Sequence, residues 1–104
     1  MPDEEIRALK DCFVQALDPV SVYLFGSFAS GTAAADSDFD FYIVVDDAHT
    51  DTLDLMTRAY AACSAIKRRP VDILVGTKSK FEARKQRPTI ENEVFHKGVL
   101  LYGA

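Results

Sequence analysis

Two closely spaced aspartates are the residues of this sequence whose types and spacing most directly indicate chemistry. Asp38 and Asp40 are separated by Phe39 at the start of a run with strand character. Residues two apart in a strand project from the same face, about 6.5–7 Å apart along the chain. Carboxylates so placed repel each other unless a cation lies between them, and such oxygen ligands suit Mg²⁺ or Mn²⁺. The alternative is a pair of solvated acids where a strand begins.

A third acid, Asp72, interrupts the otherwise apolar run 71–75. Because unpaired carboxylates are seldom buried, Asp72 either lies in water at the end of its strand or interacts with a charged group. If its strand neighbours the strand that bears Asp38 and Asp40, three carboxylates converge near one end of a sheet. These three are therefore the candidate metal ligands.

Gly26 and Ser27 stand where a strand ends and a short helix begins. Unpaired backbone N–H groups at a helix start favour an anion, glycine permits a ligand to approach closely, and serine adds a hydroxyl donor. The pair is a candidate phosphate site, although a strand followed by Gly-Ser is also an ordinary turn. Together, the acids and the phosphate site indicate metal-assisted chemistry at a phosphate, with two cations at the attacking and leaving oxygens.

The elements that must position these residues follow from hydrophobic periodicity and capping signals. Two long helices are predicted at 6–17, capped by Asp3, and at 53–66. A third helix begins at a capping box formed by Ser79 and Glu82 and ends at Pro88, and a fourth runs from its cap Thr89 to about residue 96. Strands are predicted at 20–25, 38–45, 71–75, where Gly76 ends the strand, and 99–102, with one helical turn at 28–30. This order predicts an α/β or α+β fold in which a single small mixed sheet is flanked by helices, as one domain over 1–104.

Length and composition limit the class of protein. The chain has 104 residues, of which 48% are hydrophobic and 27% charged, as in an ordinary globular domain. The start is acidic, unlike a secretory signal, and the longest apolar run, 99–102, cannot span a membrane, so we expect a cytoplasmic protein. Cys12 and Cys63 lie in helical patterns without zinc spacing, which predicts reduced thiols in the core. His49 and His96 have no neighbours at ligand spacing, and we assign them no role.

The charge is unevenly distributed. The net charge is −4, which argues against direct binding of nucleic acid. Residues 1–66 carry twelve acidic and three basic residues, whereas residues 67–104 carry nine basic and four acidic residues. An acidic half beside a basic half suits a site for metal cations and a polyanion, but solvated helix faces explain the same pattern.

The segment from Gly26 to Asp40 resembles a known family. Gly26–Thr32 followed by Ser37–Asp40 closely resembles the minimal nucleotidyltransferase (MNT) subgroup of the superfamily that includes DNA polymerase beta. The resemblance continues through 70–74, around 89–90 and 98–103, and so covers nearly the whole chain. Two positions depart from the family pattern, since Ser30 and Phe41 stand where members often have arginine and leucine.

The resemblance implies a function for each site residue. Gly26 and Ser27 would hold the triphosphate of ATP, Asp38 and Asp40 would bind Mg²⁺ (two ions), and Asp72 would complete the second metal site or activate the acceptor hydroxyl. The reaction would transfer a nucleoside monophosphate, AMP from ATP. Many minimal members are antitoxins encoded beside a helical HEPN-domain ribonuclease, and some inactivate it by adenylylating a tyrosine.

The sequence leaves the identity of the acceptor and of the partner open. Larger relatives carry a helical second domain, and because this chain ends with the minimal domain we expect a partner chain or a homo-oligomer to complete the site. The basic residues of 78–87 would face a partner or the triphosphate, or form a solvated helix face. A non-catalytic antitoxin that neutralises its partner by occlusion is the alternative function. A small-molecule transferase fits less well, because no second domain encloses such an acceptor.

Overall fold

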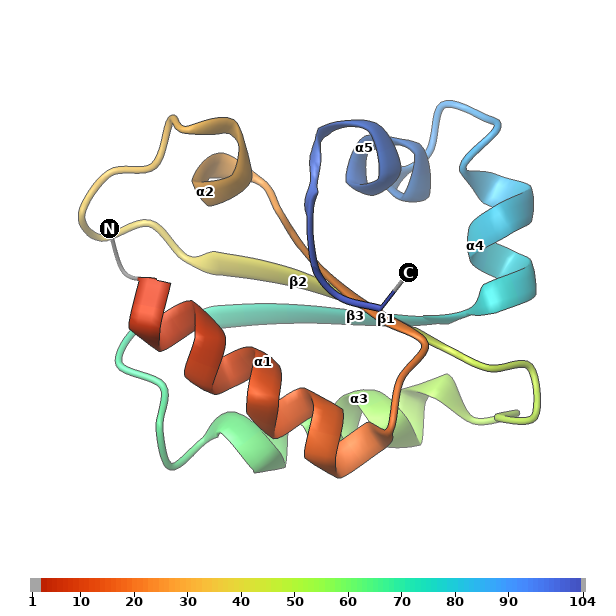
Figure 1. Ribbon diagram of the computed structural model, residues 1–104, viewed down its shortest axis with the longest axis horizontal. Helices are drawn as coiled ribbons and strands as arrows, with labels where there is room; N and C mark the ends of the chain where they lie inside the picture. Colours follow the sequence, from red (N-terminus) through yellow and green to blue (C-terminus); the bar gives the residue numbers. More distant parts are fainter. Residues whose placement is uncertain (1–2, 104) are drawn as a thin grey trace.

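The computed structural model describes residues 3–103, in which helices flank one four-stranded sheet (Figure 1). The helices are α1 (Asp3–Leu17), α2 (Ser27–Ser30), α3 (Thr52–Cys63), α4 (Lys78–Arg84) and α5 (Ile90–Lys97). The strands are β1 (Ser21–Phe25), β2 (Phe39–Val45), β3 (Val71–Thr77) and β4 (Val99–Tyr102). Helices α1 and α3 cover one face of the sheet, and α4 and α5 cover the other. The predicted mixed sheet flanked by helices is confirmed.

The sheet has the strand order β3-β2-β1-β4. Strands β2 and β3 are parallel and joined through α3, whereas β1 pairs antiparallel with both β2 and β4. The carboxyl end of β1 therefore lies beside the amino ends of β2 and β3. As a result, the turn after β1 and the acids at the start of β2 and β3 share one end of the sheet.

Alternation along β2 determines which face each side chain occupies. Phe39, Phe41 and Ile43 are fully buried in the larger core, against α1 and α3. Tyr42 belongs to a smaller core on the opposite face, under α4 and α5. Because side chains alternate, Asp40 shares the face of Tyr42 rather than that of the large core.

Two element boundaries near the site differ from the predictions. β2 begins at Phe39, so Asp38 precedes the strand instead of belonging to it. α3 ends at Cys63, and Ile66 lies beyond the helix because the Cys63 carbonyl accepts from the amides of both Ile66 and Lys67 in a closing turn. Leu53, where the predicted helix begins, is 70% exposed.

The strand and helices of the second half also differ in detail. Gly76 does not end β3, since it pairs with Val44 and the strand continues to Thr77. Thr77, not Ser79, caps α4 by accepting from the Lys80 amide at 3.3 Å. The Ser79 amide instead donates to Asp47 at 2.9 Å, so the predicted capping box does not form.

Other helix ends give a mixed result. α4 ends at Arg84, before Pro88. Asp3 is the first helical residue of α1 and not its cap. Thr89 does cap α5, where its hydroxyl accepts from the Asn92 amide at 3.2 Å, as predicted.

Two expectations about the environment of the chain can be compared with the fold. Cys63 is buried, Cys12 is half-buried, and both are free thiols. No helix within residues 3–103 has the length and apolarity needed to cross a bilayer.

Candidate active site

The parallel pairing of β2 and β3 brings the predicted acids together. Asp40 and Asp72 are direct register partners, and Asp38 is two residues before Asp40. The side chains of Asp38 and Asp72 are exposed and that of Asp40 is half-buried. Asp72, which is far from the other two acids in sequence, therefore lies with Asp38 and Asp40 at one end of the sheet.

Asp40 has an electrostatic environment that disfavours its charged form. Burial raises the pKa of Asp40, and the charges of Asp72 and Asp38 raise it further. A side-chain hydrogen bond with Asp72 adds to this effect. Since the charges that raise the pKa of Asp40 are those of other acids, a bound cation would relieve the repulsion.

Gly26 forms the other side of this cluster. Its φ of 74° lies in a region that L side chains rarely adopt, and a Cβ at this position would overlap Oδ2 of Asp40. Phe25, the residue before it, pairs with Asp40 across β1 and β2. The glycine is thus required twice, for the backbone conformation and for the close approach of the Asp40 carboxylate.

The turn that carries Ser27 is closed by local hydrogen bonds. The amides of Gly31 and Thr32 both donate to the Ser27 carbonyl, the latter at 3.0 Å. The Ser30 hydroxyl lies 3.2 Å from the same carbonyl and 2.8 Å from the Thr32 hydroxyl. Ser30, where the resembling family often has arginine, is therefore part of the turn itself.

The donor set fits a hard divalent cation that is shared with a ligand. Within residues 3–103, no three His, Cys, Asp or Glu side chains gather closely enough to hold a metal ion unaided. Mg²⁺ is commonly held by one or two carboxylates together with substrate phosphates, rather than by a complete protein cage. The adjacent Asp40 and Asp72 side chains would supply the two carboxylates, and their mutual repulsion favours a cation between them.

One acidic residue near the site was not predicted. Glu93 on α5 is exposed, and its charge also contributes to the raised pKa of Asp40. In the sequence it is one of two acids in the first turn of a capped helix, where acids are common for reasons of the helix dipole alone. Its proximity to Asp40 follows from the packing of α5 on the sheet, which spacing does not reveal.

The basic segment 78–87 is only partly available to a ligand. Arg84 forms an ion pair with Glu91 at 2.8 Å. Lys85 pairs with Glu82 at 2.6 Å, and its ammonium lies 4.1 Å from the centre of the Phe95 ring. At least two of its cations are therefore engaged within the fold and fit neither a ligand-binding nor a fully solvated face, since the Lys85 side chain is only 17% exposed.

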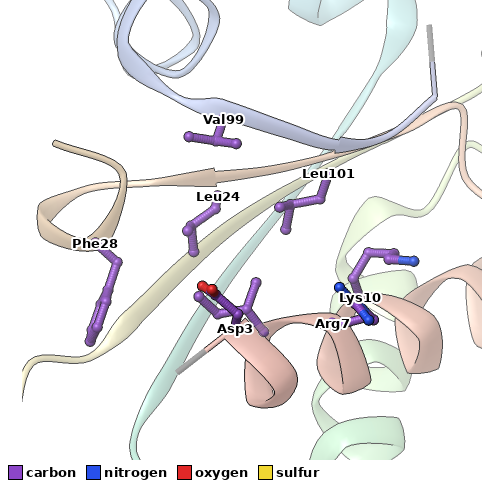
Figure 2. Close-up of a pocket in the computed structure, with 8 residues that line it drawn as sticks. Asp3, Arg7, Lys10, Leu24, Phe28, Val99 and Leu101 are labelled. Atoms are coloured by element: carbon purple, nitrogen blue, oxygen red, sulfur yellow. The ribbon is translucent and has the colours of Figure 1, made fainter. Parts of the chain in front are cut away.

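A cavity of about 370 Å³ lies elsewhere, between α1, α2, β1 and β4 (Figure 2). It is lined by Asp3, Ile6, Arg7, Lys10, Leu24, Phe28, Val99 and Leu101. Figure 2 shows that Leu24 and Leu101 extend from neighbouring strands, with Arg7 and Lys10 on the helix below. No acid of the candidate site lines this cavity, so the predicted chemistry belongs to the open sheet end instead.

The fold, with acids on adjacent parallel strands beside a Gly-Ser turn, matches one class of protein domain. The nucleotidyltransferase domain family matches residues 6–100, and the chain therefore belongs to that family. This result confirms the family resemblance seen in the sequence. No curated protein sequence matches the chain.

Solved structures share the fold at low sequence identity. A candidate nucleotidyltransferase from Sulfolobus solfataricus aligns with a TM-score of 0.64 and 19% identity, over 96% of this chain and 78% of that one. A toxin–antitoxin structure with AMP-PNP aligns with a TM-score of 0.55 and 21% identity, over 96% and 73%. A mutant of the MntA–HpeT toxin–antitoxin pair, with two Asp→Glu substitutions, gives a TM-score of 0.55 and 20% identity over the same shares.

Proposed function

We propose that this chain is a Mg²⁺-dependent nucleotidyltransferase that transfers AMP from ATP to a hydroxyl of a partner protein, as the antitoxin of a toxin–antitoxin pair. The observation that carries the proposal is the register of β2 and β3, which sets Asp40 against Asp72 beside Gly26. Membership of the nucleotidyltransferase family supports the reaction type. The AMP-PNP and toxin–antitoxin structures support the choice of nucleotide and of partner.

The proposed reaction is a displacement at the α-phosphorus of ATP. The acceptor oxygen forms a bond to the α-phosphorus, the bond to the bridging oxygen breaks, and pyrophosphate leaves with the electron pair. Asp72, which is exposed, either accepts the hydroxyl proton or completes the second metal site. Mg²⁺ would neutralise charge on the phosphates when bound.

The remaining residues have holding functions in this proposal. Asp38 and Asp40 hold Mg²⁺, and a two-ion arrangement would use Asp72 as well. Gly26 and Ser27 hold the triphosphate, which lies close to the acids because the Gly26 backbone contacts the Asp40 carboxylate. In the MntA–HpeT pair, two aspartates were replaced by glutamate, which supports the choice of an aspartate pair as the site here.

Transfer of label from α-³²P-ATP to a co-expressed partner tests the proposal. We expect Mg²⁺-dependent labelling of a helical HEPN-type partner by the wild-type chain, and none by a variant with both Asp38→Ala and Asp40→Ala. Labelling that survives the double substitution, or no labelling of any co-encoded protein, would contradict the enzymatic proposal. Labelling of the chain itself would indicate a homo-oligomeric acceptor.

Occlusion of a partner without catalysis is the second candidate function, and the β4 edge favours it. β4 is an outer strand of the sheet, and Val99 and Leu100 are 44% and 43% exposed there. An apolar edge strand of this kind is a surface on which another chain can dock. A variant without Asp38, Asp40 and Asp72 should then still bind and silence the partner at equal stoichiometry, and its failure to do so rejects occlusion.

A further inference from the structure

Arg69 connects the parts of the candidate site that come from different segments of the chain. It lies in the connection between α3 and β3, outside every helix and strand, and its side chain is only 21% exposed. In the sequence it is one of three consecutive basic residues that end a predicted helix, with nothing to distinguish it from Arg68. The contacts of its guanidinium are what distinguish it.

The first set of contacts holds the loop that leads to Asp38. Nη1 of Arg69 donates to the carbonyl oxygens of Ala35 at 3.2 Å and Ser37 at 3.4 Å. The second acceptor belongs to the residue directly before Asp38. Arg69 thus contacts the backbone within one residue of a proposed metal ligand.

The second set of contacts is with two aromatic rings, one beside the Gly-Ser turn and one between the two aspartates. The guanidinium carbon lies 5.2 Å from the ring centre of Phe28 and 4.6 Å from that of Phe39. Phe28 is in α2, directly after Ser27, and Phe39 stands between Asp38 and Asp40. The two rings also pack against each other, with their centres 4.7 Å apart.

A third contact fixes the guanidinium itself. Nε donates to Oε2 of Glu5 at 3.2 Å, and the Glu5 side chain is 18% exposed. Glu5 is in α1, which packs against the sheet through the large core. The arginine is therefore anchored to helix α1 through Nε. Its Nη1 contacts the loop before Asp38, and its planar face lies against Phe28 and Phe39.

The loop has little else to hold it. Residues 31–38 carry small or polar side chains, and a turn in which the Ala34 amide donates to the Ser37 hydroxyl at 2.8 Å is local to the loop. No hydrophobic side chain of this loop belongs to either core. The Phe39 amide donates to the Pro70 carbonyl at 3.2 Å, which ties the end of the loop to the residue after Arg69.

We propose that Arg69 is the positioning residue of this site, which fixes Asp38 and α2 relative to Asp40 and thereby sets the geometry for Mg²⁺ and the triphosphate. The inference rests on the proposed function, because it concerns the same ligands. Arginine suits this position because a planar guanidinium donates in two directions while it stacks on rings, and lysine cannot do all three. Displacement of a ligand by about 1 Å is enough to lower the rate of a positioned reaction about 100-fold.

The experiment compares Arg69→Met and Arg69→Lys with the matched control Arg68→Met. Arg68 is exposed and forms no ion pair or side-chain hydrogen bond within the described part of the chain. Mn²⁺ affinity in the presence of AMP-PNP is measured by electron paramagnetic resonance, and amide hydrogen exchange is followed over residues 31–40. The transfer rate is measured against Mg²⁺ concentration on the same samples.

For Arg69→Met we expect Mn²⁺ affinity at least about tenfold weaker, faster exchange confined to the loop, and transfer partly restored by high Mg²⁺. Arg69→Lys should fall between this variant and the wild type, and Arg68→Met should match the wild type. Unchanged Mn²⁺ affinity and loop exchange in Arg69→Met would overturn the inference. If Arg69→Met does not fold, Glu5→Gln removes the anchoring charge with less disturbance and should weaken Mn²⁺ binding in the same direction.

Failure of the proposed function gives a different result. If the wild-type chain itself binds no Mn²⁺ with AMP-PNP, the nucleotidyl-transfer proposal fails for this chain. Loop exchange then still tests Arg69, because faster exchange in Arg69→Met but not in Arg68→Met supports its hold on the loop. Equal exchange in both variants rejects it.

Discussion

Two carboxylates on the same face of the sheet have opposite environments. Burial and the charges of Asp72 and Asp38 raise the pKa of Asp40. Glu91 on α5 is 3% exposed, yet it accepts from the Tyr42 hydroxyl and from Nε of Arg84, each at 2.8 Å. Burial raises the pKa of Glu91, but these two hydrogen bonds, a backbone hydrogen bond and the charge of Arg84 together outweigh that effect, and the net pKa is lowered.

The difference separates a structural acid from a candidate functional one. Glu91 is compensated by the fold and joins β2, α4 and α5, so its charge is stable without a ligand. Asp40 lies on the same strand as Tyr42, two residues away, and has no such compensation. Acids left uncompensated at one end of a sheet are typical of functional sites, because repulsion of this kind costs stability in the free protein.

The largest expected effect is on activity at the uncompensated site. Asp40→Asn should lower the rate of nucleotidyl transfer at least about 100-fold, because it removes a proposed metal ligand while it keeps the side-chain shape. The free energy of unfolding of the metal-free protein should stay the same or rise, since the substitution relieves repulsion from Asp72. Urea denaturation and α-³²P-ATP labelling measure the two quantities on one preparation. A large loss of stability would mean that Asp40 is structural, and the contrast with Glu91 would fail.

At the compensated acid the expected effect is on stability. Glu91→Ala should lower the free energy of unfolding by about 2 kcal/mol, because it leaves the Tyr42 hydroxyl buried without its acceptor and Arg84 without its partner. Urea denaturation of this variant is compared with that of Glu82→Ala, which breaks a pair between Lys85 and an exposed carboxylate and should cost less than about 1 kcal/mol. Equal effects of the two substitutions would show that the buried network does not stabilise the fold.

A pair of glycines offers a sharper comparison, since each lies against a β2 side chain. A Cβ at Gly76 would overlap the Tyr42 hydroxyl, so Gly76→Ala should cost about 1–2 kcal/mol of unfolding free energy, and the added substitution Tyr42→Phe should recover part of it. Gly26→Ala would instead overlap the Asp40 carboxylate and should weaken binding of Mn²⁺ with AMP-PNP. Calorimetric melting of the Gly76 variants and spin-resonance titration of the Gly26 variant test this division. If Gly76→Ala weakened Mn²⁺ binding and Gly26→Ala did not, this assignment of the two glycines would be wrong.

The smallest effect is in the pH dependence of stability. Because the folded pKa of Glu91 is lowered, its contribution is fully present above the unfolded-state pKa, about 4.3, and is lost as pH falls through the folded value. The difference in unfolding free energy between the wild type and Glu91→Gln should therefore narrow, by less than about 1 kcal/mol, between pH 6 and pH 3. Chemical denaturation at several pH values measures it. A difference that widens with acid would contradict the lowered pKa.

Much of the fold followed from local patterns. The apolar spacing within residues 6–17 predicted α1 because one apolar stripe per helix must face a core. Thr89 predicted the start of α5 because its hydroxyl replaces a missing backbone partner. Local patterns were less successful where a distant segment supplied the partner. Ser79 does not begin a capping box because Asp47 accepts from its amide, and Gly76 does not end β3 because the ladder with Val44 continues past it.

The candidate site shows the same division. The residue types and spacing of Gly26, Ser27, Asp38 and Asp40 were visible in the sequence, because a turn and an Asp-x-Asp segment are local features. The nearness of Asp72 depended on a condition, that β3 should lie beside β2, and the parallel register met it. Nothing in the sequence separated Arg69 from Arg68 or connected Glu93 to Asp40.

The sequence by itself determined the acids, the turn and the periodicity of the elements, since these depend on neighbours within a few positions. Only the tertiary structure decided which acid the fold compensates and which it leaves exposed to repulsion. That outcome depends on side chains from β3, α4 and α5 that meet across the sheet. Electrostatic energy is set by distances in space, and a linear pattern does not contain those distances.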